Sequence, residues 1–390
     1  MNRLLAAMLA ALMLLSLAAC GSAPQTAEPS PAPAPPTAYE PSPSPVPEPP
    51  VDPLEKFLDS MTLAEKGGQL FFVRCPVENA AEDVRAYHLG GYILFGRDTK
   101  DKTANELIQA IQSYQDAAVP LLIGVDEEGG TVIRVSSNPH LRSEKFPSPQ
   151  KLFAKGGLEA VTADTREKDA LLAALGFNVN LAPVADVSTD PNAFIYPRTL
   201  GRDTADTADY VSAVTGQMRA DTMGSVLKHF PGYGDNADTH TGVAVDNRPY
   251  EDFVNGDFLP FLSGMAAGGD TSAVLVCHNI VECMDPDLPA SLSPAVHDIL
   301  RTDLAFDGVV MTDDLAMDAV SAYAGDGAVA VMALEAGNDL VLTTDYRTQI
   351  PKVLEAVENG TLEEAAIDTA CRRVLRWKQA LGLLPTEPEV

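Results

Sequence analysis

Short, almost uninterrupted apolar runs recur along the chain from residue 69 onward. There are eight: QLFFV (69–73), GYILFG (91–96), PLLIGVD (120–126), FNVNLAPVAD (177–186), GSVLKHFPG (224–232), SAVLVCHN (272–279), GVVMTDD (308–314) and NDLVLTT (338–344). Strands that are buried on both faces, as in a parallel sheet, have this composition. The runs therefore predict eight buried, parallel strands.

Amphipathic segments alternate with these runs, for example TANELIQAIQSYQDAA and TADYVSAVTGQMRADT. Eight βα units over this length predict an α/β fold of the (β/α)8 TIM-barrel type. A doubly wound sheet would usually carry a glycine-rich loop after its first strand, and none follows residues 69–73. The stretch at 350–383 predicts closing helices. We expect one catalytic domain at 54–384, followed by a tail at 385–390.

The amino terminus has the pattern of a bacterial lipoprotein. Arg3 precedes an apolar run that ends at Ala19, shorter than the ~20 residues of a spanning helix, so residues 1–19 are interpreted as a signal peptide. LAAC resembles a lipobox, which implies lipidation of Cys20; the alternative is an uncleaved anchor with an incidental cysteine. Residues 20–53 are a proline-rich linker. We expect attachment through the lipid to the outer face of the cytoplasmic membrane.

Charge and cysteine content exclude other classes of protein. The chain has 27 basic and 55 acidic residues, a formal net charge of −28, which does not suit a nucleic-acid partner. The remaining cysteines form no CxxC pair, so buried free thiols are expected; a disulfide is permitted outside the cell, but the spacing does not require one. The first run is not followed by an HxH motif, so a zinc-type metal site is not predicted.

Polar residues gather where the predicted strands end, which is where the active site of a barrel forms. They are Asp126 and Arg134 after the third run, Asp186 and Arg198 after the fourth, Lys228 and His229 in the fifth, His278 in the sixth, and Asp313 and Asp314 in the seventh. Asp186 and Asp314 fit helix capping as well as chemistry. Arg198 also fits a solvated loop charge, and His278 fits a buried structural histidine better than a catalyst.

The loop KHFPGYGDNADTH ends in the unit Asp238-Thr239-His240. Residues two apart in an extended stretch point the same way, so the carboxylate can reach the imidazole and fix its tautomer. Such a pair can deliver and retrieve a proton; the alternative is a turn held by the aspartate side chain. An acid/base pair facing a carboxylate suits glycoside cleavage, and metal-assisted hydrolysis is the less favoured alternative.

The chain resembles glycoside hydrolase family 3, in its single-domain β-N-acetylhexosaminidase branch. The similar stretches include MTLAEKGGQLFFV, GGYILFGRD, PLLIGVDEEGGTVIR, NLAPVADV, RTLG, KHFPGYGDNADTH, the block from LPASLSP to TDDLAM, and ALEAGNDLVL. The loop is one residue shorter than is common in the family, and Tyr233 and Thr131 replace more usual residues. The family's β-glucosidases carry a second sheet domain that is not seen here, which favours N-acetylhexosamine as the sugar.

The resemblance implies a role for each candidate. Asp313 matches the nucleophile that forms a covalent glycosyl-enzyme, and His240 matches the general acid/base with Asp238 as its partner. The positions that match those holding the terminal sugar are Asp126, Arg134, Arg198, Lys228 and His229. The resemblance implies hydrolysis of terminal β-linked N-acetylglucosamine with retention, without metal or cofactor.

Two other functions are compatible with these residues. One is a phosphorylase on the same scaffold, because a histidine acid/base repels phosphate less than a carboxylate would. The other is a non-catalytic sugar-binding lipoprotein, although a receptor has no use for a nucleophile and a paired acid. We expect a monomer whose partner is carbohydrate, either cell-wall fragments or chitin-type oligosaccharides.

Overall fold

The computed structural model describes residues 52–385, except 235, 237–243, 322 and 324–327. These residues belong to one compact unit, Val51–Val390. The predicted signal peptide, Cys20, most of the linker, Asp238 and His240 all lie outside the described residues. Within the part that is described, no helix is long and apolar enough to cross a membrane.

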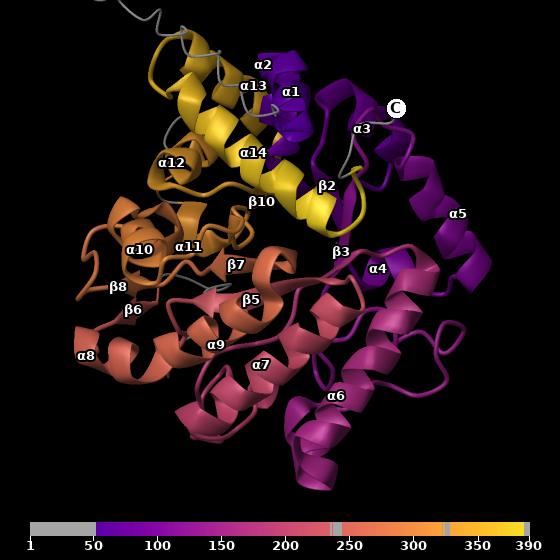
Figure 1. Cartoon of the computed structure of the whole chain (residues 1–390), viewed down its shortest axis with the longest axis vertical. Coiled ribbons are helices and arrows are strands. Elements are labelled where there is room, and N and C mark those ends of the chain that lie inside the picture. The colour runs from indigo at the N-terminus through magenta and orange to yellow at the C-terminus, as the bar shows by residue number, and fades with distance from the viewer. Residues whose placement is uncertain (1–51, 235, 237–243, 322, 324–327, 386–390) are drawn as a thin grey trace, which may run out of the picture. The chain divides into compact units, whose positions relative to one another are not determined.

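Eight parallel strands form a closed barrel, which confirms the predicted fold class (Figure 1). Their order is β10-β1-β2-β3-β4-β5-β7-β9, and a parallel bridge between Met311 and Leu340 joins the two ends. Each of the eight apolar runs contributes one strand. The strands are β1 (Phe71–Arg74), β2 (Gly91–Leu94), β3 (Leu122–Val125), β4 (Val179–Asn180), β5 (Gly224–Phe230), β7 (Ser272–Val276), β9 (Val310–Thr312) and β10 (Val341–Thr343).

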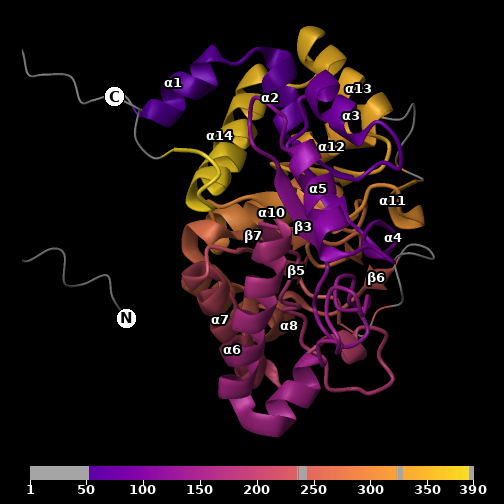
Figure 2. The same cartoon turned by 90° about the vertical axis from the view of Figure 1, so that its right-hand side faces the viewer.

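The helices surround this barrel (Figures 1 and 2). They are α1 (Pro53–Ser60), α2 (Leu63–Gln69), α3 (Ala80–Tyr87), α4 (Gly96–Thr99), α5 (Ala104–Tyr114), α6 (Pro149–Leu175), α7 (Thr204–Ala220), α8 (Tyr250–Asp252), α9 (Phe258–Gly268), α10 (Pro294–Asp298), α11 (Asp318–Ser321), α12 (Val329–Ala336), α13 (Tyr346–Glu358) and α14 (Glu364–Ala380). Both amphipathic segments quoted above are helices, α5 and α7. The expected closing helices are α13 and α14.

Local sequence explains where several helices begin. Thr62 and Thr103 each accept a hydrogen bond from the backbone N–H three residues on, and Glu65 and Glu106 accept from the backbone of those threonines. These capping boxes satisfy donors that have no partner inside the helix. At the other end of the chain α14 returns to α2, and Lys66 pairs with Asp368 at 2.7 Å.

The barrel interior is filled in layers. A Cβ on Gly124 of β3 would lie 2.4 Å from Cζ of Phe72, so the aromatic ring of Phe72 occupies the space that a larger residue in β3 would need. Side chains alternate along a strand, so Arg74, two residues after Phe72, points the same way at the end of β1. A second sheet, β6 (Val245–Asp246) with β8 (Ile280–Val281), has no counterpart among the predicted runs.

The thiols differ from expectation at one position. Cys75, Cys277 and Cys371 are free and buried as expected, and burial raises the pKa of both Cys75 and Cys371 to about 12. The prediction is wrong for Cys283, which is free and exposed. It lies just after β8, at the end of this small sheet, where the apolar neighbours in the sequence do not enclose it.

Lys378 of α14 makes the stability of the fold depend on pH. The side chain is fully buried, its Nζ donates to Oε1 of Gln69 at 2.7 Å, and burial lowers its pKa to about 7. The unfolded chain therefore binds more protons than the folded chain between pH 7 and the usual lysine pKa of about 10.4. The contribution of Lys378 to stability therefore rises with pH across this interval, by up to about 1.4 kcal/mol per pH unit.

Replacing Lys378 with methionine should remove that slope. Urea titrations at pH 6 to 9 give the free energy of unfolding of wild type and of Lys378→Met. Above pH 7 we expect this free energy to rise with pH in wild type relative to the variant. Below pH 7 the difference should be constant, since both states of the wild type then carry the proton. A difference that stays constant from pH 6 to 9 would contradict the assignment.

Candidate active site

A cavity of about 610 Å³ opens at the carboxyl ends of the strands. Its floor is apolar, made by residues in or just after β2, β4, β7 and β10: Ile93, Leu181, Leu275 and Leu342. Above them lie charged residues at the ends of the strands that alternate with these, β1, β3, β5 and β9: Arg74, Asp126, Lys228 and Asp313. We call these four the charged ring. Contributions from alternate strands are the usual layering of such barrels, and here the uppermost layer carries charge.

Lys228 links two strands of the charged ring. Its Nζ lies 2.7 Å from Oδ1 of Asp126 and 2.6 Å from Oε1 of Glu128. Burial would lower the pKa of Lys228, but the two carboxylates outweigh it and raise that pKa above its usual value. The ammonium is therefore held charged and fixed, with Asp126 oriented beside it in the cavity.

Glu128 is the common partner of the buried cations. Its carboxylate also accepts two hydrogen bonds from Arg198, from Nε at 3.0 Å and from a terminal nitrogen at 2.8 Å. Burial opposes its ionisation, yet Arg198 and Lys228 outweigh burial and hold the pKa of Glu128 well below the usual range. A bidentate contact of this kind fixes the plane of the guanidinium. Arg198 is thus no solvated loop charge.

His229 has a defined tautomer. Its Nδ1 lies 2.7 Å from Oδ2 of Asp186, and its Nε2 lies 3.1 Å from a guanidinium nitrogen of Arg198. A guanidinium only donates, so Nε2 accepts and the proton is on Nδ1, where it is donated to Asp186. Asp186 also accepts from the backbone N–H of Tyr233 at 2.7 Å. Of the two interpretations of Asp186, a positioning role is the one that the contacts support.

Lys228 and His229 both line the cavity although they are neighbours in one strand. The pairing of β5 with β7 shifts register between Lys228 and Phe230, and the Lys228–His229 peptide is cis. A break in register of this kind redirects a side chain at the rim of a barrel.

Arg134 reaches the cavity from the loop after β3. A terminal nitrogen of its guanidinium lies 3.9 Å from Oδ2 of Asp126. The loop is held by the buried Glu127, whose carboxylate accepts from the backbone N–H groups of Arg134 and Val135, both at 2.7 Å. The position of Arg134 is therefore set by a buried carboxylate one residue away from Asp126.

The two adjacent aspartates after β9 both line the cavity but make different hydrogen bonds. The Oδ1 of Asp313 accepts from the backbone N–H of Asp314 at 2.8 Å. The carboxylate of Asp314 accepts from the backbone N–H of Ala316 at 3.0 Å and so shapes the following turn. His278 is fully buried, with Nδ1 2.7 Å from Oγ of Ser291 and Nε2 3.1 Å from the backbone oxygen of Asp314. His278 is thus the buried structural histidine that was expected.

The loop that carries Asp238 and His240 is described only at its two ends. Arg248 joins them: a terminal nitrogen of its guanidinium donates to the backbone oxygen of Gly232 at 3.4 Å, and the guanidinium pairs with Asp246 and with Asp257, each at 2.8 Å. Gly232 and Gly234 have φ of +132° and +58°, and a Cβ on Gly232 would lie 2.2 Å from Oδ1 of Asp257. The glycines of this loop therefore have a backbone reason, because they let the chain pass close to the Arg248 cluster.

Six of the predicted site residues line one cavity: Asp126, Arg134, Arg198, Lys228, His229 and Asp313. Three features of the site were not predicted from the sequence: the shared carboxylate of Glu128, the contact of Asp186 with His229, and Arg74. The sequence does indicate Glu128 and Arg74, because each is a charged residue at or just after the end of an apolar run. Nothing in the sequence indicates the contact of Asp186 with His229, since it depends on how β4 and β5 are placed relative to each other.

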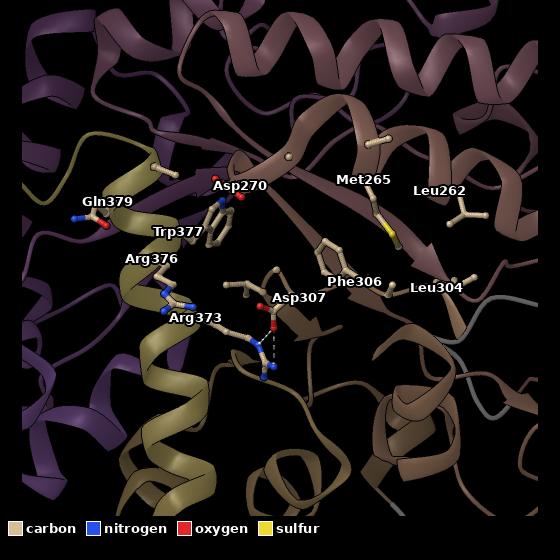
Figure 3. Close-up of a pocket in the computed structure, with 16 residues that line it drawn as sticks. Leu262, Met265, Asp270, Leu304, Phe306, Asp307, Arg373, Arg376, Trp377 and Gln379 are labelled. Carbon is tan, nitrogen blue, oxygen red and sulfur yellow. Dashed lines mark hydrogen bonds and ion pairs between the residues drawn. The ribbon is translucent and has the colours of Figure 1, made fainter. Parts of the chain in front are cut away.

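A larger cavity, about 780 Å³, lies elsewhere, between α9, α14 and the segments that precede β7 and β9 (Figure 3). Its labelled polar groups include Asp307 and Arg373, which pair with each other at 2.9 Å (Figure 3). This is the amino-terminal end of the strands, where residues of such barrels contribute to stability and not to chemistry. The smaller cavity is the candidate active site.

Comparison with known proteins shows what the chain is similar to. The family described as "Glycosyl hydrolase family 3 N terminal domain" matches residues 62–377. Beta-hexosaminidase LpqI of Mycobacterium tuberculosis is 34% identical over 307 residues, which are 76% of this chain and 77% of that protein. A beta-hexosaminidase of Xanthomonas campestris is 34% identical over 304 residues, 76% of this chain and 90% of that protein.

Solved structures show the same fold. A glycoside hydrolase family 3 β-N-acetylglucosaminidase from Paenibacillus sp. superposes with a TM-score of 0.76 at 31% identity, over 83% of this chain and 63% of that one. The structure of M. tuberculosis LpqI gives a TM-score of 0.74 at 30% identity, over 82% of this chain and 95% of that one.

Proposed function

Because this chain belongs to glycosyl hydrolase family 3, within its β-hexosaminidases, we propose that it removes terminal, non-reducing, β-linked N-acetylglucosamine residues with retention of configuration. The observation that carries the proposal is the placement of Asp313 in one cavity with the fixed cations Arg198 and Lys228. The names of the relatives support the sugar, and the resemblance of the Asp238-Thr239-His240 unit supports the acid/base.

The reaction has two steps. A carboxylate oxygen of Asp313 attacks the anomeric carbon, the bond to the leaving oxygen breaks, and His240 gives that oxygen its proton. Water then attacks the anomeric carbon of the glycosyl-aspartate, His240 takes the proton of the water, and the carboxylate of Asp313 is released. Asp238 would hold the imidazole in the required tautomer.

The polar groups of the cavity would bind the sugar that is removed. Asp126 accepts from sugar hydroxyl groups, and Lys228, Arg134 and Arg198 donate to hydroxyl oxygens or to the acetamide carbonyl. Their mutual ion pairs hold them in place before substrate arrives, so little ordering is needed on binding. The closed, apolar floor of the cavity suits removal of one terminal residue.

The test is hydrolysis of an aryl β-N-acetylglucosaminide followed by NMR. The β-anomer should be the first product, before mutarotation. First release of the α-anomer would contradict retention, and no hydrolysis would contradict the activity. A rate that depends on added phosphate, with N-acetylglucosamine 1-phosphate as product, would favour the phosphorylase.

The lipid anchor is part of the same proposal and is supported by the lipobox-like sequence at Cys20. The full chain should sediment with membranes after cell breakage, and Cys20→Ala should release it. Equal sedimentation of both forms would contradict the anchor.

A further inference from the structure

Phe194 is an exposed aromatic side chain at the candidate active site. In the part of the chain that the structure describes, five large aliphatic side chains are exposed: Val77, Val245, Val254, Leu259 and Leu262. Phe194, 40% exposed, is the one aromatic residue of this kind there, and unlike those five it lines the cavity that contains Asp313. Single exposed hydrophobic residues are common on protein surfaces, so the location of Phe194 is what requires a reason.

The backbone that carries Phe194 is fixed on its carboxyl side. The next side chain, Ile195, is fully buried, and its backbone oxygen accepts from the N–H of Arg198 at 2.9 Å. The guanidinium of Arg198 is held in turn by two hydrogen bonds to the buried carboxylate of Glu128. Phe194 therefore lies at a defined place at the edge of the cavity, four residues before a cation of the site.

Tyr233 supports the ring of Phe194 from one side. The two ring centres lie 5.8 Å apart with an angle of 40° between the ring planes, and Tyr233 itself is buried. Tyr233 also lies edge-on to the ring of His229, with the ring centres 5.6 Å apart. Aromatic rings at these separations attract each other. The exposed part of the Phe194 ring is thus the part turned away from Tyr233.

The cavity changes from buried and polar to exposed and apolar toward Phe194. Lys228 is buried, and the side chains of Asp126 and Arg198 are mostly buried. These are groups that would bind the sugar that is removed. Because that sugar would occupy the buried end, the group to which it is linked must lie farther out, where Phe194 is exposed.

We propose that Phe194 is a platform for the pyranose ring of the leaving group, the sugar to which the terminal N-acetylhexosamine is linked. The inference rests on the proposed function and adds a residue that determines specificity for the leaving group. A pyranose with equatorial hydroxyl groups carries C–H groups on its two faces. Such a face is removed from water when it lies on an aromatic ring, and its C–H groups meet the negative face of that ring.

The side chain of Phe194 also limits what it can select. It has no hydrogen-bonding group and no charge, so it favours a flat, apolar face and does not distinguish one pattern of hydroxyl groups from another. A small aliphatic alcohol as leaving group cannot cover the ring and gains nothing from it. The class of leaving group that Phe194 favours is therefore a ring sugar over a short alkyl group.

The experiment compares two neutral substrates that share the terminal sugar. They are the β-linked disaccharide of N-acetylglucosamine and methyl β-N-acetylglucosaminide, whose leaving group has no ring. In Phe194→Ala we expect the ratio of kcat/KM for the disaccharide to kcat/KM for the methyl glycoside to fall by about tenfold relative to wild type, the size of one aromatic contact. Phe194→Tyr keeps the ring and should keep the wild-type ratio; a ratio as low as in Phe194→Ala would contradict the platform.

A matched control removes an exposed hydrophobic side chain elsewhere. Leu259 in α9 is 41% exposed and lines neither of the two cavities described above, so Leu259→Ala should leave the ratio as in wild type. An equal fall for both substrates in Phe194→Ala would overturn the proposal, because it would mean that Phe194 acts on the sugar that is removed or supports the site through Tyr233. An unchanged ratio with unchanged rates would also overturn it.

Binding measurements separate this inference from the proposed function. If wild type hydrolyses neither substrate, the proposed function fails, and calorimetric titration of the full chain with the same two compounds then decides the role of Phe194. Tighter binding of the disaccharide than of the methyl glycoside, lost in Phe194→Ala, would support the platform. Equal binding of the two compounds to wild type, or no binding of either, would overturn it.

Discussion

Asp313→Asn should lower kcat toward an aryl β-N-acetylglucosaminide by about four powers of ten or more. An amide cannot form the glycosyl-enzyme, and loss of a nucleophile has an effect of this order. Asparagine has the same shape, and its carbonyl oxygen can still accept from the backbone N–H of Asp314, which now lies 2.8 Å away. The fold should therefore be retained, as circular dichroism and thermal unfolding would show.

The matched control is Asp314→Asn. The carboxylate of Asp314 accepts from the backbone N–H of Ala316, and an asparagine carbonyl can replace it in that turn. We expect a loss of less than about tenfold in kcat, set against the far larger loss in Asp313→Asn. The reverse order would identify Asp314 as the nucleophile, and near-normal rates in both would exclude a covalent mechanism at this position.

Glu128→Leu should reduce the free energy of unfolding by about 3–5 kcal/mol, the usual cost of removing one partner from a buried ion pair. The glutamate side chain is 3% exposed and is the partner of both Arg198 and Lys228. Without it, Lys228 keeps only Asp126 as an ion-pair partner, and the Arg198 guanidinium loses the carboxylate with which it pairs. Urea titration at neutral pH measures the change.

The same substitution should also impair substrate binding, because Arg198 and Lys228 lose the contact that orients them. We expect kcat/KM to fall by at least about a hundredfold. Glu167→Leu is the control: this glutamate pairs with Arg142 but is 62% exposed, and pairs of that kind contribute about 1 kcal/mol or less. Equal destabilisation by both substitutions would show that the Glu128 cluster contributes little.

The strands could be predicted because their signal is local. A strand buried on both faces must be apolar along most of its length, so runs such as PLLIGVD and SAVLVCHN could be recognised one at a time. The small sheet of β6 and β8 could not, because two residues per strand leave no pattern. Cys283 was misplaced for a related reason: apolar neighbours predict burial only where the surrounding fold encloses them.

Six candidate site residues were also predictable, because a barrel brings the ends of all its strands to one side. The ion pairs and hydrogen bonds that these residues form were not predictable. That Lys228 lies between Asp126 and Glu128, or that His229 takes its tautomer from Asp186, depends on the register between strands more than 40 residues apart in the chain. The Asp238 and His240 assignment remains a prediction from the sequence.

By itself, the order of apolar runs predicted the barrel, the polar residues that end them predicted the end at which the candidate residues gather, and the resemblance of the motifs predicted the family. Only the tertiary structure decided which charged side chains of the site form ion pairs with one another. The reason is physical: an ion pair depends on distance and burial, which no spacing along the chain reports. Arg74 shows the difference, since in the sequence it is an ordinary arginine at the end of a strand, and in the fold it is a partly buried cation whose guanidinium lies over the ring of Phe95.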